Sequence, residues 1–180
     1  MELIVFIIAS IFIIAISWRT IFRFKSYGFY RFLSWECILL LLTFNYKFWF
    51  ADPLSVFQIL SWIFLINSLI LIIPSIYLLK KLGNAIFDER STLYKFEKTT
   101  NLIDDGIFKF VRHPMYGSLL FLTWGMLFKR PIPFLIIISI FSTIFLFITA
   151  KIEEKENIKF FGHKYKVYIK RSKMFIPYIF

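Results

Sequence analysis

Long apolar runs recur along this sequence and limit the folds that it can adopt. A helix needs roughly 20 predominantly apolar residues to cross a bilayer, and fewer where neighbouring protein covers it. Hydrophobic residues make up 59% of the 180 residues, more than a soluble domain of this length can bury. We therefore expect an all-α integral membrane protein with about five transmembrane helices. The five runs are, approximately, Leu3–Trp18, Phe32–Phe48, Leu54–Leu79, Met115–Phe128 and Ile132–Ala150.

The last two runs predict a tight helical hairpin. The fourth run is short, and only the segment KRPIP, 129–133, separates it from the fifth. Glycine and proline number six each, and no repeat or Ser-rich stretch provides a flexible linker, so we expect one membrane domain over residues 1–180. The first run follows an acidic residue and has no small-residue cleavage site, which is typical of a retained helix and not of a signal peptide.

The basic residues predict the orientation in the membrane. Of the 22 Lys and Arg, all but Lys47, Lys129 and Arg130 fall on one side of the five predicted spans. The excess of positive charge marks the cytoplasmic side, so we expect the N-terminus outside and the C-terminus inside. The polar segments 80–114 and 151–180 then share the cytoplasm, the second as a helical segment. Because the net charge of +11 gathers at the ends of apolar runs, it indicates membrane orientation and not a nucleic-acid partner.

The loop before the fourth run, NLIDDGIFKFVRHPMYG at 101–117, carries the first candidate site. Pro114 fits the first position of a helix, where its missing N–H has no partner to lose. We expect the amides of Met115, Tyr116 and Gly117 to lie unpaired at the interface, where a helix start attracts anions. Arg112 adds a planar donor for a carboxylate or phosphate. A capped helix start with interfacial anchors is the alternative.

The second candidate site follows the fifth run directly, in a stretch otherwise rich in lysine. Carboxylates near a helix C-terminus oppose the helix dipole, so Glu153 and Glu154 need another explanation. A surface face of Glu–Lys pairs would explain one of them. Both together, opposite the anion-binding helix start, favour a cation site. The combination suits a zwitterionic or mixed-charge cofactor. No Cys or His cluster has the spacing of a metal site.

The two segments together resemble the isoprenylcysteine carboxyl methyltransferase and phospholipid methyltransferase superfamily. The resemblance covers residues 100–180 and includes a helical hairpin between its two parts. Ile107 stands where the family pattern has proline, and Asn157 where it usually has leucine. The matching residues are Gly106, Val111-Arg112-His113-Pro114, Tyr116, Gly117, Glu153-Glu154, Phe161-Gly162, Tyr165, Tyr168 and Ile176-Pro177.

The resemblance implies a methyltransferase that uses S-adenosylmethionine on the cytoplasmic side and a lipophilic acceptor from the bilayer. It implies Arg112 and His113 as catalytic residues, with His113 as the base if the acceptor is an amine. The acceptor stays open among a prenylcysteine carboxylate, a phospholipid amine and another lipid, and the oligomeric state is open as well. The implied cofactor-binding residues are Arg112, His113, Pro114, Met115, Tyr116, Gly117, Glu153 and Glu154.

Two other functions remain as alternatives. A nicotinamide-dependent membrane reductase of the steroid-reductase type has a similar C-terminal architecture, but Glu153 and Glu154 would repel its polyanionic cofactor. A non-catalytic membrane protein would bind no small-molecule cofactor. For the methyltransferase, segment 84–105 is a candidate for a cytoplasmic lid over the cofactor.

Overall fold

The computed structural model describes residues 2–82 and 101–179. Within these residues the regular structure is helical, and a single isolated bridge joins Val111 to Lys173. The expectation of an all-α protein is confirmed. The helices are α1 (Glu2–Ile21), α2 (Tyr27–Asn45), the 3-10 helix η1 (Tyr46–Phe48), α3 (Val56–Leu82), the 3-10 helix η2 (Gly106–Lys109), α4 (Pro114–Leu127), α5 (Pro133–Phe161) and α6 (His163–Arg171).

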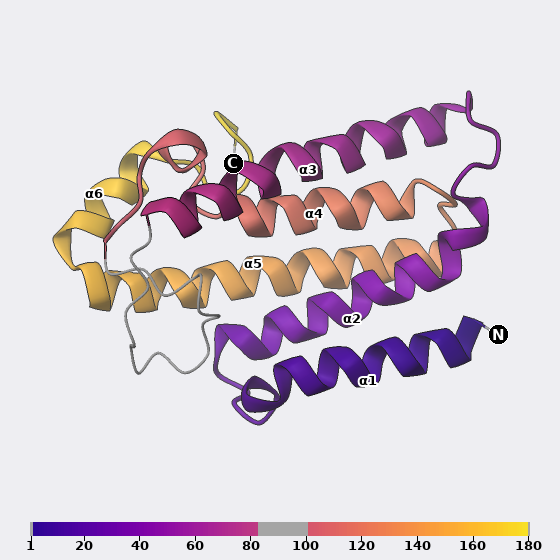
Figure 1. Ribbon diagram of the computed structural model, residues 1–180, viewed down its shortest axis with the longest axis horizontal. Coiled ribbons are helices and arrows are strands. Elements are labelled where there is room, and N and C mark those ends of the chain that lie inside the picture. The colour runs from indigo at the N-terminus through magenta and orange to yellow at the C-terminus, as the bar shows by residue number, and fades with distance from the viewer. Residues whose placement is uncertain (1, 83–100, 180) are drawn as a thin grey trace.

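The five long helices lie side by side, and α6 closes one end of the row (Figure 1). Helix α4 packs between α3 and α5, and α2 packs between α5 and α1. Three helices in the described part of the chain, at Leu3–Ile21, Val56–Leu82 and Pro133–Phe161, are long and apolar enough to cross a membrane. Helix α4 has 14 residues and is about 21 Å long, shorter than the ~30 Å hydrocarbon core. Crossing by all five helices stays a prediction.

The outer surface of the row is apolar, which identifies a multi-pass membrane protein. Helix α1 exposes Ile8 and Phe12 at 65% and 68%, and α3 exposes Ile73 at 64%. Single exposed apolar residues are common on soluble proteins, but a continuous apolar surface over several long helices requires lipid around it.

Small polar side chains join the helices inside the row. The hydroxyl of Ser34 on α2 lies 2.9 Å from that of Ser142 on α5, which lies 3.1 Å from that of Thr123 on α4. All three residues are fully buried. Ser61 on α3 donates to the carbonyl of Gly125 on α4 at 2.7 Å. Small residues let helices approach closely in a membrane, and their hydroxyls hydrogen-bond within or between them.

The turn between α4 and α5 forms the predicted hairpin and is fixed by Lys129. This side chain is 5% exposed. Its ammonium donates to the carbonyl of Trp49 at 3.1 Å and to Oε1 of Gln58 at 2.9 Å, and it lies 3.8 Å from the centre of the Trp62 ring. Lys129 therefore joins the α4–α5 turn to the α2–α3 connection and to the first turns of α3, at the opposite end of the row from α6.

Helix α5 continues well beyond the predicted end of the fifth span at Ala150. Its 29 residues reach Phe161 and make it about 43 Å long. The glutamates and lysines after Ala150 end the apolar run but favour helix, so a change of polarity was the wrong boundary signal. The helix ends at Gly162, whose φ of +60° and ψ of −130° suit glycine. The chain turns there into α6, and the cytoplasmic location of this C-terminal segment stays a prediction.

Candidate active site

The chain before α4 pairs with the C-terminal segment that follows α6. The amide of Arg112 donates to the carbonyl of Lys173 at 2.9 Å, and the amide of His113 donates to that of Met174 at 3.1 Å. In return the amide of Lys173 donates to the carbonyl of Phe110 at 2.9 Å. These bonds fix the backbone that carries Arg112 and His113, so the direction of both side chains depends on residues about 60 positions away.

Helix α4 begins at Pro114, as expected, but the Gly117 amide is not available to a ligand. It donates to the carbonyl of His113 at 2.9 Å, because the first i to i−4 bond of the helix already forms there. A Cβ on Gly117 would lie 2.7 Å from the carbonyl oxygen of Phe175. The absence of a side chain at Gly117 thus allows the C-terminal segment to approach α4, and Gly117 does not line the cavity described next.

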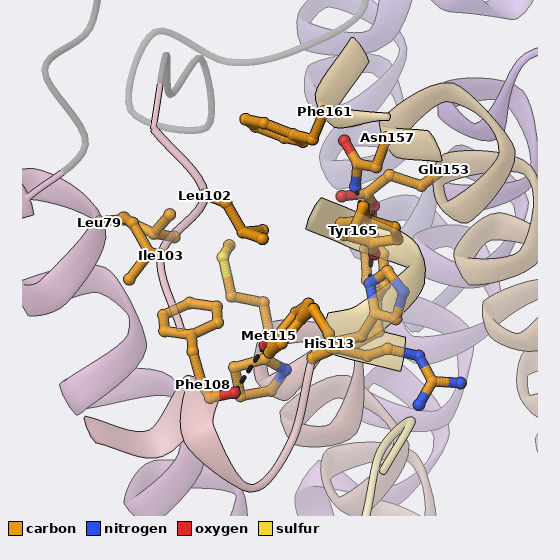
Figure 2. A pocket seen from close by; sticks show the side chains of 14 residues that line it. Leu79, Leu102, Ile103, Phe108, His113, Met115, Glu153, Asn157, Phe161 and Tyr165 are labelled. Atoms are coloured by element: carbon orange, nitrogen blue, oxygen red, sulfur yellow. Dashed lines mark hydrogen bonds and ion pairs between the residues drawn. The ribbon is translucent and has the colours of Figure 1, made fainter. Parts of the chain in front are cut away.

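A cavity of about 730 Å³, including the solvent at its mouth, lies where α3, α4, α5 and α6 meet. Figure 2 shows an apolar wall with Leu79, Ile103 and Phe108 opposite a polar wall with Glu153 and Asn157. The lining residues are Leu79, Leu102, Ile103, Phe108, Arg112, His113, Pro114, Met115, Tyr116, Glu153, Asn157, Phe161, Tyr165 and Tyr168.

Two buried polar atoms in the polar wall lack a hydrogen-bond partner among the described residues. They are Nε2 of His113 and Oε2 of Glu153. Nε2 of His113 lies 3.6 Å from Oε1 of Glu154, and Nδ1 of His113 lies 4.0 Å from Oε2 of Glu153, both beyond hydrogen-bond distance. The His113 ring stacks on Tyr116 at a centroid distance of 5.6 Å. Unpaired buried polar atoms are costly, so these two indicate a place for a polar ligand.

Arg112 and Glu154, predicted to bind opposite groups of one ligand, instead contact each other. Nε of Arg112 donates to Oε1 of Glu154, and the two side chains are only 9% and 8% exposed. The guanidinium also donates through Nη1 to the carbonyl of Ser172 at 2.8 Å, and Lys151 donates to Oε2 of Glu154 at 3.2 Å. Arg112 still lines the cavity, whereas Glu154 does not.

Tyr165 and Tyr168 on α6 complete the polar wall, together with Asn157. The hydroxyl of Tyr168 donates to the carbonyl of Phe108 at 2.6 Å, and Nδ2 of Asn157 lies 3.5 Å from the hydroxyl of Tyr165. Burial raises the pKa of both tyrosines, so both phenols keep their protons at neutral pH. They are hydrogen-bonding groups in this wall and not bases.

The structure thus brings most of the predicted site residues to one cavity. Glu154 lies behind Arg112, and Gly117 lies against Phe175. Tyr165 and Tyr168 match the family pattern, whereas Asn157 departs from it and the apolar wall had no local signal. Of the proposed lid 84–105, residues 84–100 lie outside the described part, and Leu102 and Ile103 line the cavity. The predicted residues in the cavity are Arg112, His113, Pro114, Met115, Tyr116 and Glu153.

The fold and the cavity define a helical membrane protein with a cavity at one end of its helices. The model of the phospholipid methyltransferase family matches residues 56–164, and the chain belongs to this family. It is also similar to the methanethiol S-methyltransferase of Pseudomonas deceptionensis, with 34% identity over 71 residues. That match covers 39% of this chain and 26% of the relative, so the chain spans about a quarter of the length of the relative it matches. No solved structure matches the chain.

Proposed function

We propose that the protein is a methyltransferase that transfers a methyl group from S-adenosylmethionine to a lipophilic acceptor at the cytoplasmic face of the membrane. The observation that carries this proposal is the cavity itself. Two unpaired buried polar atoms, on His113 and Glu153, stand in a wall that faces an apolar wall beside the membrane helices. Membership of a methyltransferase family supports the same reaction class.

The residues of the polar wall fit the groups of S-adenosylmethionine. The carboxylate of Glu153 suits its ammonium group or a ribose hydroxyl. The guanidinium of Arg112 has five N–H donors, of which the bonds to Glu154 and Ser172 use two. The remaining donors and the start of α4 at Pro114 suit the cofactor's carboxylate. The negatively charged diphosphate of a nicotinamide cofactor would be repelled by the carboxylate of Glu153. This repulsion disfavours the reductase alternative.

When bound, the cofactor supplies a methyl group on a positively charged sulfur, which an acceptor takes by displacement. The residues of the cavity hold the two reactants at attack distance and exclude water from them. Positioning of this kind can supply several kcal/mol, up to ~7–11 kcal/mol in ideal models. The apolar wall of Leu79, Ile103 and Phe108 keeps the reacting centre dry, which favours a reaction in which charge becomes less concentrated.

Whether methyl transfer needs a general base depends on the acceptor, and His113 is the candidate for that base. A carboxylate acceptor is already deprotonated and needs no base. An amine or thiol acceptor must release a proton, and Nε2 of His113, when unprotonated, is a buried acceptor without a partner. His113 is therefore the general base for such an acceptor. Its position is fixed by the backbone bond to Met174 and by the Tyr116 ring.

The test of this function uses the purified protein with labelled S-adenosylmethionine and extracts of host lipids and small thiols. We expect label to transfer to a lipophilic product. A reduced nicotinamide cofactor is titrated in parallel, and binding of this cofactor without binding of S-adenosylmethionine would favour the reductase. Among acceptor analogues, apparent affinity should improve by about 0.8 kcal/mol for each added buried methylene. Equal turnover of short- and long-chain analogues would contradict a lipophilic acceptor.

A further inference from the structure

Asn157 contributes an amide to the polar wall, one helical turn beyond Glu153 on α5. The two residues are four positions apart, so they share a face of the helix and lie about 6 Å apart along its axis. The amide has two N–H donors and a carbonyl acceptor. Its bond to the Tyr165 hydroxyl, at 3.5 Å, is at the upper limit of hydrogen-bond length. Most of its hydrogen-bonding capacity is therefore left for a ligand in the cavity.

An aromatic ring lies next to this amide. Phe161 is a further four residues along α5 and also lines the cavity. Its ring is half-buried and stacks on that of Tyr165, with a centroid distance of 6.3 Å and an interplanar angle of 19°. Figure 2 shows Phe161 at the same end of the cavity as Asn157, with the Leu102 side chain below it. This end therefore combines flat apolar surface with an amide at its edge.

We propose that Asn157 reads the hydrogen-bonding edge of the adenine ring of the cofactor, with Phe161 as the stacking partner of that ring. The inference rests on the proposed use of S-adenosylmethionine and deepens it. An Asn side chain matches the donor and acceptor pattern on the edge of adenine, and aromatic side chains stack on any base. Glu153, one turn back along α5, then lies next to the ribose hydroxyls.

The place of Asn157 along α5 favours the cofactor over the acceptor as its ligand. The residue lies seven positions beyond Ala150, the last residue of the apolar run, and so about 10 Å farther along the helix axis. A lipophilic acceptor enters from the bilayer and meets the apolar wall first. The end of the cavity farthest from the apolar run, with its aromatic ring and amide, suits the nucleoside. The leucine usual in the family pattern at this position has no group that could read a purine edge.

The decisive probes are S-adenosylhomocysteine and its 6-deamino analogue, which lacks only the exocyclic amino group of the adenine. In calorimetric titration of the wild-type protein, we expect the deamino analogue to bind about tenfold more weakly, the size of one lost hydrogen bond. Equal binding of the two ligands to the wild-type protein would overturn the inference and leave the proposed function standing. Failure of both ligands to bind would overturn the proposed function and the inference with it.

The variant Asn157→Leu tests whether the Asn157 amide causes the difference in affinity between the two ligands. It introduces the residue usual in the family, and we expect it to bind the two ligands equally; if it does not fold, Asn157→Ser serves the same purpose. Phe161→Leu should weaken the binding of both ligands by the same factor, at least about fivefold. Lys159→Leu, an exposed position on the same helix, should keep the tenfold difference. Retention of that difference in Asn157→Leu would show that another group reads the purine, which overturns the inference.

Discussion

Arg112 and Glu154 form an ion pair at the edge of the cavity, with both side chains more than nine-tenths buried. They stand 42 positions apart in the sequence, one before α4 and the other near the end of α5. The guanidinium also holds the carbonyl of Ser172, so this one pair joins α5, the start of α4 and the C-terminal segment. The first role of the pair is to position the backbone around the cavity. Mutation of either residue is therefore expected to lower stability and not only ligand affinity.

Breaking this ion pair should destabilise the protein, and the two partners should not be equivalent. Removing one partner of a buried pair typically costs ~3–5 kcal/mol, because the other charge is left without compensation. In Arg112→Met, Lys151 still pairs with Glu154 at 3.2 Å, whereas in Glu154→Gln the buried guanidinium has no carboxylate. We therefore expect the larger fall in thermal unfolding temperature for Glu154→Gln. The double variant should lose less than the sum of the two, and additive losses would contradict a direct pair.

Glu153 should affect cofactor binding and not folding. Its side chain is 20% exposed, and its Oε2 has no hydrogen-bond partner in the described residues. A charge-assisted hydrogen bond to the cofactor is worth ~1.5–3 kcal/mol. Glu153→Gln should thus weaken S-adenosylhomocysteine binding about ten- to a hundredfold, measured by calorimetry. Lys159→Gln and Lys170→Gln make charge changes of similar size outside the cavity and should alter binding less than about threefold. The lysine variants remove a charge of the opposite sign, so a general charge effect would change binding in the opposite direction from Glu153→Gln. Equal losses in all three variants would show that the loss in Glu153→Gln does not report a contact with the ligand.

Gly117→Ala should separate the C-terminal segment from α4. The new Cβ would lie 2.7 Å from the carbonyl oxygen of Phe175, a backbone atom that cannot rotate away. Forcing an extra carbon into such a contact typically costs ~1–3 kcal/mol. Gly28→Ala is a matched control, because its Cβ meets the side chain of Thr20 and not a backbone. We expect a larger fall in thermal stability for Gly117→Ala, and a smaller one would show that the segment adapts without strain.

Lys129 should stabilise the fold without any effect on the cavity. Its ammonium is held by Trp49, Gln58 and Trp62 at the opposite end of the row of helices. Lys129→Met should lower the free energy of unfolding by about 1.5–3 kcal/mol, the value of a hydrogen bond to a charged group. Affinity for S-adenosylhomocysteine, measured on the folded variant in detergent, should stay unchanged. A loss of affinity with no loss of stability would contradict this assignment.

Single cysteines in a Cys37→Ser background test the predicted orientation. Lys109 and Lys170 are exposed on the cavity side, and Leu54 is 87% exposed in the α2–α3 connection. Cysteines at Lys109 and Lys170 should react with an impermeant reagent only from the cytoplasmic face, because the basic residues gather there. A cysteine at Leu54 should react only from outside. Labelling of Lys109 and Leu54 from the same side would contradict the proposed five crossings.

The helices could be predicted from the sequence because their signals are local. Apolar runs, the proline at the start of α4 and the glycine after α5 each act within a few residues, and the predicted hairpin followed from a five-residue connection. Boundaries were less certain where two local signals disagreed. The charged residues after Ala150 end the membrane run but not the helix, so α5 exceeds its prediction by three turns.

The site could be predicted only in part, for a different physical reason. Residue types at motif spacing identified Arg112, His113 and Glu153, since charge near a membrane interface requires an explanation wherever it occurs. Whether Glu154 faces a ligand or Arg112 depends on the rotation of α5 about its axis, which packing against α2 and α4 sets. The same packing brings Leu79, Phe108 and Asn157 to one cavity from three separate segments. Helix formation is decided by neighbours along the chain, whereas the partners of each side chain are decided by close packing between distant segments.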